Sequence, residues 1–231
     1  LSKAASSAQV KGTGSVFNFV IPRTLIIPSN SKESITTSIS SINVKSDIYR
    51  VATPMLSERV FIQSKVQNTS DFILLPGEAS IYYGSDYIGR TRLETVTPNE
   101  TFTINLGIDQ MMSAKRKLIQ KETSNTGLFG SGEQTLYSYQ IDLDNGHSKP
   151  IDIRIFDRMP KSQNEKIAIS LLNNSYSLSS NNSYIETQYK QGILRWDLKL
   201  NENSTSTNEL KLKWDIEVSH GKEIDITPLP E

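Results

Sequence analysis

The sequence predicts an all-β protein made of two antiparallel β-sandwich subdomains, the second of them immunoglobulin-like. The main observation is an alternation of apolar and polar residues with a period of two, which recurs in many segments. This pattern is typical of strands that have one solvated face. Turn-forming residues separate the segments. The chain has 231 residues, which is enough for two β-domains whose cores need no disulfide or metal.

The first half of the chain contains a series of predicted strands. In residues 59–66, Val60, Ile62 and Ser64 share one face. Gly84-Ser85-Asp86 is a turn signal between two alternating segments and therefore predicts a β-hairpin. The predicted strands of this half are residues 16–20, 59–66, 79–83, 87–91 and 101–106.

The second half shows the same pattern in residues 136–143, 151–156, 166–171, 193–200 and 210–218. Trp196 and Trp214 lie in the last two of these segments, on apolar faces, and we expect both in the core. Residues 108–120 contain good helix formers and fit either a short helix or a long strand. We favour the strand because the neighbouring segments are all β.

The polar segments 121–134, 173–191 and 201–208 are rich in Ser, Asn, Thr or Gly and are predicted to be loops or turns. We therefore expect a linker at residues 1–14, a first sandwich at 15–107, and a second sandwich at 108–231 that ends in a short C-terminal tail.

The composition argues against several classes of function. Lys and Arg number 25, Asp and Glu also number 25, and the pI is near 7.0. This balance argues against nucleic acid as a partner, which requires a basic excess. The absence of Cys excludes disulfides, thiol nucleophiles and cysteine-based metal centres. The two histidines, His147 and His220, provide little for a metal site, and we expect neither metal nor cofactor.

The chain also lacks the signals of a membrane-spanning or exported segment. No apolar run approaches about 18 residues, so no transmembrane helix is expected. Residue 1 is Leu and the first residues are small and polar. We therefore expect the chain to be part of a longer or processed protein, with any secretory signal upstream of residue 1.

Two short motifs suggest ligand binding but fit turns better. Asp142-Leu143-Asp144-Asn145-Gly146 resembles the start of a calcium loop, yet the twelfth position is Ile153, which cannot ligate calcium. We interpret it as a hairpin turn in which Asn145-Gly146 supplies positive φ. The glycine-rich segment 127–132 is followed by a strand rather than a helix, so it is predicted to be a loop and not a phosphate cradle.

No catalytic constellation stands out. The acids Asp152, Asp215 and Glu217 lie at outward strand positions or in turns, and no pair is singled out for glycoside hydrolysis. Neither His147 nor His220 neighbours a nucleophile-elbow motif. The triplets that begin at Asn68, Asn99, Asn173, Asn181 and Asn203 match the glycosylation pattern and are also expected by chance in a chain so rich in Asn, Ser and Thr.

Tyr82 and Tyr87 flank the predicted hairpin turn and are the candidate contact residues of the chain. An outward tyrosine pair can stack on a sugar ring or anchor a protein partner. Cross-strand packing that steadies the hairpin is the simpler interpretation, and we favour it.

A series of short segments, in this order, resembles the C-terminal domain of unknown function of the mucoidy-inhibitor-A-like proteins. The resemblance covers residues 11–219. It rests on Gly12-Thr13-Gly14, Phe19-Val20-Ile21-Pro22, Ile27-Pro28-Ser29-Asn30, Tyr49-Arg50-Val51-Ala52-Thr53-Pro54, Asn68-Thr69-Ser70, Leu74-Leu75-Pro76-Gly77, Tyr87-Ile88-Gly89-Arg90-Thr91, Leu106-Gly107-Ile108-Asp109, Asp157-Arg158-Met159-Pro160, Ser162, Asn164-Glu165 and Gly192-Ile193-Leu194-Arg195-Trp196-Asp197. It implies an all-β fold, an upstream N-terminal domain with a long coiled coil, and an export signal in many bacterial members. It implies no catalytic mechanism, cofactor or substrate.

These observations together predict a non-enzymatic binding or assembly module at the C-terminus of a coiled-coil protein of the cell envelope (periplasmic) or outside the cell. The expected partner is another protein or the upstream coiled coil of the same protein. A carbohydrate-binding module, based on Tyr82 and Tyr87, is one alternative. A hydrolase that uses surface carboxylates is the other.

Overall fold

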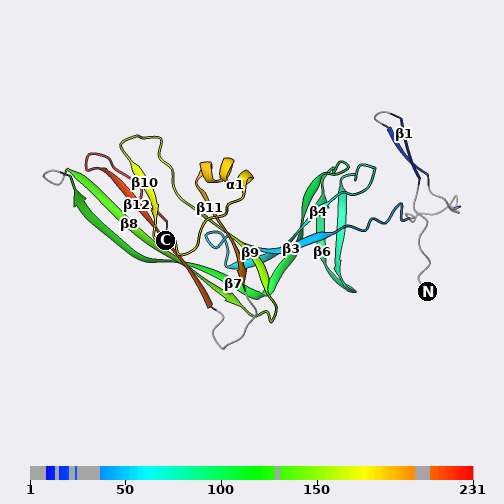
Figure 1. Cartoon of the computed structure of the whole chain (residues 1–231), viewed down its shortest axis with the longest axis horizontal. Helices are drawn as coiled ribbons and strands as arrows, with labels where there is room; N and C mark the ends of the chain where they lie inside the picture. The colour runs from blue at the N-terminus through cyan, green and yellow to red at the C-terminus, as the bar shows by residue number, and fades with distance from the viewer. Residues whose placement is uncertain are drawn as a thin grey trace, which may run out of the picture. The chain divides into compact units, whose positions relative to one another are not determined.

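A computed structural model describes residues 9–13, 16–20, 24, 37–127, 131–200 and 209–230. It confirms the all-β class, since strands dominate the described residues and helix is almost absent from them. The elements are β1 (Gln9–Thr13), β2 (Val16–Val20), β3 (Ser46–Ala52), β4 (Arg59–Gln67), β5 (Gly77–Tyr83), β6 (Asp86–Leu93), β7 (Thr101–Thr126), β8 (Gly132–Asn145), β9 (Ile151–Arg158), β10 (Ala168–Leu172), the short helix α1 (Asn182–Glu186), the 3-10 turn η2 (Tyr189–Gln191), β11 (Ile193–Leu200) and β12 (Glu209–Gly221) (Figure 1).

The described strands form one large sheet and two hairpins. The large sheet has eight strands in the order β10-β12-β8-β7-β4-β3-β9-β11. Most of its neighbours are antiparallel, as β8 and β12 are along their whole length (Figure 1), whereas β3 and β9 pair in parallel. The hairpins are β1-β2 and β5-β6. The finer expectation of two sandwiches, one of them immunoglobulin-like, stays a prediction.

The chain divides into two compact units, and each unit is formed by two separate stretches of the sequence. The first unit comprises residues 1–47 and 64–104, and the second comprises residues 48–63 and 105–231. The first unit holds both hairpins, and β1 lies inside the predicted linker 1–14. The second unit holds β8 to β12. The proposed boundaries at residues 14 and 107 stay a prediction.

The core of the second unit is built around two tryptophans, as the sequence predicts. Trp196 of β11 and Trp214 of β12 are both fully buried, and their ring centroids lie 5.3 Å apart. Tyr139 of β8 stacks on Trp214 at 5.5 Å. Because β11 and β12 are far apart in the strand order, this contact requires the sheet to curl back on itself within the unit.

In the first unit, the buried side chain of Asn68 joins two loop segments. Its amide group donates to the carbonyl oxygens of Phe72 (2.9 Å) and Val96 (3.2 Å). Its oxygen accepts from the backbone N–H and the hydroxyl of Ser70. All of its polar atoms are therefore satisfied inside the fold, which is the condition for burying an amide at low cost. This first residue of a glycosylation triplet acts here as a structural residue.

The structure settles the nature of residues 108–120 and corrects the prediction for the segment that follows. β7 runs through residues 108–120 as a strand, which confirms the favoured alternative. It continues to Thr126, and β8 begins at Gly132, so most of the predicted loop 121–134 is strand. The loop prediction was wrong because the paired strand satisfies the backbone and so permits polar residues on both faces. Thr123 and Thr135, for example, share a cross-strand hydroxyl contact of 3.0 Å.

Two further turn predictions need correction. The predicted loop 173–191 contains α1 and η2, and the side chain of Asn181 caps α1 by accepting from the N–H of Tyr184. Asn145 is the last residue of β8, and neither Asn145 nor Gly146 has a positive φ. Gly146 instead allows a close approach, because an added Cβ would lie 3.0 Å from the carbonyl oxygen of Met111.

Gly192 joins η2 to β11. Its backbone conformation and its close surroundings both require a glycine. Its φ is 82°, in the left-handed region, which costs free energy for a residue with a Cβ. An added Cβ would also lie 2.4 Å from the carbonyl oxygen of Met159. The Gly192 carbonyl oxygen accepts from the N–H of Met159 at 2.8 Å, so the backbone has little room to shift.

We expect Gly192→Ala to lower the free energy of unfolding by about 2 kcal/mol or more, because positive φ and a steric clash act together. Urea denaturation followed by tryptophan fluorescence measures the change. Gly89→Ala is the matched control, since an added Cβ there meets nothing within 4 Å. Equal stabilities for the two variants would contradict the role assigned to Gly192.

Candidate functional site: a polar face on β9 and β11

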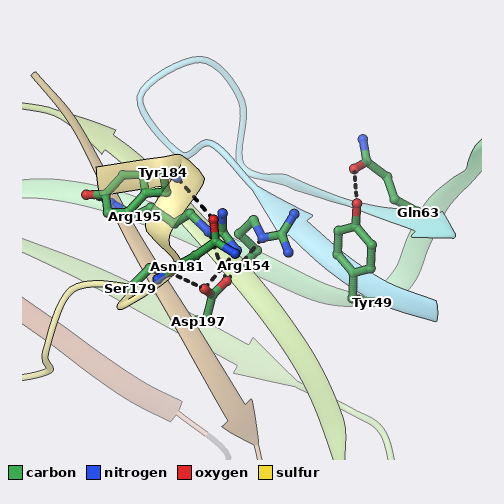
Figure 2. Close-up of polar contacts among 8 residues, drawn as sticks. All are labelled: Tyr49, Gln63, Arg154, Ser179, Asn181, Tyr184, Arg195 and Asp197. Carbon is green, nitrogen blue, oxygen red and sulfur yellow. Dashed lines mark hydrogen bonds and ion pairs between the residues drawn. The ribbon is translucent and has the colours of Figure 1, made fainter. Parts of the chain in front are cut away.

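One face of the β9–β11 pair in the second unit gathers charged and aromatic side chains (Figure 2). Ile151, Ile153 and Ile155 of β9 alternate into the core, so the residues between them point to the opposite face. Arg154 on that face is directly opposite Asp197 of β11 in the register. We call this surface the β9–β11 face.

Asp197 is the centre of this face and binds two arginines. Its carboxylate accepts from Arg154 Nε at 3.1 Å and from Arg195 Nε at 3.0 Å, and Arg195 Nη2 lies 2.8 Å from its second oxygen. The hydroxyl of Ser179 also donates to that oxygen. Burial opposes ionisation of Asp197, but the bonds from Ser179, Arg154 and Arg195 outweigh it and lower its pKa.

Tyr49 of β3 lies on the other side of Arg154. The Arg154 guanidinium carbon sits 4.5 Å from the centroid of the Tyr49 ring, which is the geometry of a cation–π contact. The Tyr49 hydroxyl donates to Gln63 Oε1 at 3.2 Å, and Gln63 in turn donates to Asn105 at 2.8 Å. Arg154 is therefore positioned from two sides, by a carboxylate and by an aromatic ring.

Tyr184 of α1 supports the outer edge of β11. Its hydroxyl donates to the carbonyl oxygen of Ile193 at 3.0 Å and accepts from the N–H of Arg195 at 3.1 Å. The N–H of Ser179 donates to the carbonyl oxygen of Arg195 at 2.8 Å. Side-chain and loop groups thus cover this part of an edge strand, which would otherwise have unpaired backbone groups. Burial raises the pKa of Tyr184, so it stays a neutral phenol.

A cavity of about 300 Å³ opens on the β9–β11 face. Its lining includes Tyr49 and the charged side chains of Asp152, Arg154, Arg195, Asp197 and Lys199. Three cations and two carboxylates meet there, and the two arginines are already positioned. The chemistry that this arrangement supports is recognition of polar or charged groups by hydrogen bonds and ion pairs.

A second charged cluster in this unit escaped the sequence analysis. Asp109 of β7 is almost fully buried and accepts from Arg50 Nε of β3 at 2.9 Å. His147 Nε2 lies 2.8 Å from each Asp109 oxygen. Burial acts against ionisation of Asp109, yet the bonds from Arg50 and His147 lower its pKa. Arg50 and Asp109 belong to two separate segments on which the family resemblance rests, but nothing in the sequence links these two residues to each other or to His147.

The predicted contact residues Tyr82 and Tyr87 belong to the first unit and lie away from these clusters in sequence. They are directly opposed across the β5–β6 hairpin, with ring centroids 5.5 Å apart. Both rings are more than half exposed. This geometry shows the cross-strand contact, and the binding role of the two tyrosines stays a prediction.

The other candidate residues are distributed over the fold. Asp142 is buried in β8 and paired with Lys117, His220 is buried in β12, Asp152 is exposed, and Asp215 and Glu217 are half-buried. Residues 128–130 of the glycine-rich segment and Asn203 lie outside the described residues.

Within the described ranges, no three His, Cys, Asp or Glu side chains come together as a metal site. In the same ranges, no helix has the length and hydrophobicity needed to cross a membrane.

Comparison with known proteins gives a family but no activity. A family model described as "Domain of unknown function (DUF4139)" matches residues 2–220. "Protein F37C4.5" of Caenorhabditis elegans is 22% identical over 166 residues, which is 72% of this chain and 30% of that protein. The chain therefore aligns with less than a third of that relative's length. No solved structure matches the chain.

We expect Asp109→Ala to lower the free energy of unfolding by about 3 kcal/mol, because Arg50 would lose its counter-ion and His147 its hydrogen-bond partner in a largely desolvated position. Chemical denaturation of the whole chain measures this. Asp152→Ala removes an exposed carboxylate from the same unit and should change stability by less than about 0.5 kcal/mol. Similar losses for both variants would contradict the importance of the Asp109 cluster.

The contribution of Asp197 to stability should depend on pH with a defined sign. The lowered pKa means that the folded state holds the proton less tightly than the unfolded state does. The stabilisation is therefore fully present above the ordinary value of 3.8 and is lost as the pH falls through the lower folded-state pKa. The stability difference between the wild type and Asp197→Asn should be larger at about pH 6 than at about pH 3. Denaturation curves at both pH values provide the check, and a difference that grows on acidification would contradict it.

Proposed function

The chain belongs to the DUF4139 family, and we propose that it is a non-enzymatic binding and assembly module. In this proposal it forms the C-terminal part of a longer coiled-coil protein of the cell envelope or the extracellular space. The C. elegans relative is more than three times as long as the aligned region, which supports a role as one domain of a larger protein. The ordered segments that resemble the mucoidy-inhibitor-A-like proteins support the more specific family, the upstream coiled coil and the location.

One observation carries the proposal: Arg154 and Arg195 are both held by Asp197 beside a cavity of about 300 Å³. Arginine and tyrosine contribute strongly to protein interfaces, because each combines a large contact area with directed hydrogen bonds. Side chains that are already positioned lose less conformational entropy on binding. The β9–β11 face has these properties, and we propose it as the contact surface for a protein partner.

The arginine-bound acids of the second unit also support binding rather than hydrolysis. Asp109, Asp157 and Asp197 are each bonded to at least one arginine. A pair of carboxylates for glycoside hydrolysis requires one protonated acid and one free carboxylate at a defined separation. Acids that are neutralised by arginines are poorly suited to either role. The carboxylate-dependent hydrolase stays an alternative without a specific supporting observation.

The carbohydrate-binding alternative rests on the exposed rings of Tyr82 and Tyr87. Exposed aromatic rings can stack on the apolar faces of sugars. Each of these rings also uses part of its surface to contact the other, which reduces the area available for a ligand. We therefore rank this function below protein binding.

Photo-crosslinking in the full-length protein tests the proposal directly. We expect a photoreactive residue at position 199, on the lining of the cavity, to give one defined adduct with the upstream region or with an envelope protein. Arg154→Glu should reduce the yield of this adduct about tenfold, because it reverses the charge at a positioned contact residue.

Arg90→Glu is the matched control, since Arg90 is an exposed arginine of the first unit that faces Glu78 at 3.7 Å. It should leave the adduct unchanged. The absence of any adduct from position 199, or an equal loss in both variants at unchanged melting temperature, would overturn the assignment of the β9–β11 face.

A further inference from the structure

A second cavity of the second unit, again of about 300 Å³, has a different chemical character. It shares no lining residue with the cavity on the β9–β11 face. Its apolar wall includes Met55, Met159, Ile216 and Leu229. We call it the Arg116 pocket, after the cation at its base.

Arg116 is held rigidly at this base. Its Nε donates to Asp157 Oδ2 at 2.9 Å, and both side chains are almost completely buried. Its guanidinium lies 3.9 Å above the centroid of the Tyr139 ring. Two independent contacts, an ion pair and a cation–π contact, therefore fix the position of the guanidinium.

Two donors of this pocket already converge on one oxygen atom. The Tyr139 hydroxyl donates to the carbonyl oxygen of Pro230 at 3.0 Å, and Arg116 Nη1 approaches the same oxygen at 3.4 Å. Pro230 belongs to the C-terminal tail, which lines one side of the pocket. The tail shows that the base of the pocket accommodates a negatively polarised oxygen beside apolar groups.

The rim of the pocket carries positive charge that no described acidic side chain neutralises. Arg158 and Lys161 line it, and among the described lining residues none is acidic. The negative charge of Asp157 is paired with Arg116 and not with the two rim cations. The Lys161 ammonium donates to the uncharged backbone carbonyl of Lys190, and no ion pair of Arg158 occurs within the described part of the chain. An anion would supply the missing charge.

The geometry points to the Arg116 pocket as a binding site for a small organic carboxylate. The carboxylate lies between Arg158 and Lys161, and its short apolar body packs against Met55 and Met159. Ligand pockets span about 300–1,000 Å³, so this pocket is at the small end and suits a short-chain acid. This site is separate from the proposed protein-binding face and does not depend on it.

Methyl NMR of methionine tests this proposal with internal controls. The chain has four methionines. Met55 and Met159 line the pocket, whereas Met112 is in the core and Met111 is exposed beside Gly146. Methyl-labelled protein is titrated with hexanoate, with hexanol as the uncharged analogue of equal chain length, and with inorganic phosphate as an anion without an apolar body.

We expect hexanoate to shift the Met55 and Met159 signals saturably and to leave Met111 and Met112 unchanged. Hexanol and phosphate should bind at least about tenfold more weakly, because each lacks one of the two contacts. Arg158→Gln and Lys161→Gln should each weaken hexanoate binding about tenfold, while Arg90→Gln should not.

Three outcomes would each overturn the site. They are the absence of a saturable shift with hexanoate, equal binding of hexanol or phosphate, and unchanged binding in both Arg158→Gln and Lys161→Gln. The methyl spectrum also reports whether each variant is folded, so a loss of binding is distinguished from a loss of structure.

Discussion

The packing of Trp196 against Trp214 is the contact on which the second unit depends. The two residues come from strands that are separated by five others in the sheet, and their rings nevertheless lie 5.3 Å apart in a fully buried core. The contact therefore closes one sheet on itself. It also determines the opposite face of β11, because residues between Leu194, Trp196 and Leu198 must point outward.

The outward face is where the charged groups are concentrated, and their pairing makes them rigid. Asp197 binds two arginines, one of which packs on Tyr49. Each such ion pair contributes little to stability when it is exposed, but it fixes the position of a side chain. A fixed cation suits recognition, because binding then costs less conformational entropy. Both cavities of the unit contain an arginine that an ion pair holds in place. The cavity on the β9–β11 face is lined by acids and bases, whereas the Arg116 pocket is lined by bases and apolar side chains.

Period-two alternation was enough to predict most of the strands and the core tryptophans. It failed for residues 121–134, where a polar composition suggested a loop, because the paired strand compensates for low intrinsic β-propensity. It also placed Asn145 in a hairpin turn, whereas Asn145 is the last residue of β8. The Asp109 cluster could not be derived from one sequence, since Arg50, Asp109 and His147 are far apart in the chain and meet only in the fold.

The sequence by itself determined the all-β class, the absence of cysteine chemistry, most of the strand positions and the resemblance to a domain family. These properties are local or compositional, so they can be derived from adjacent residues. Only the tertiary structure decided which side chains meet: Arg154 with Asp197, Arg116 with Asp157, and Asp109 with Arg50 and His147. The physical reason is that strand order and register bring together residues from distant segments, and an alternating pattern specifies the face of a side chain but not its neighbour.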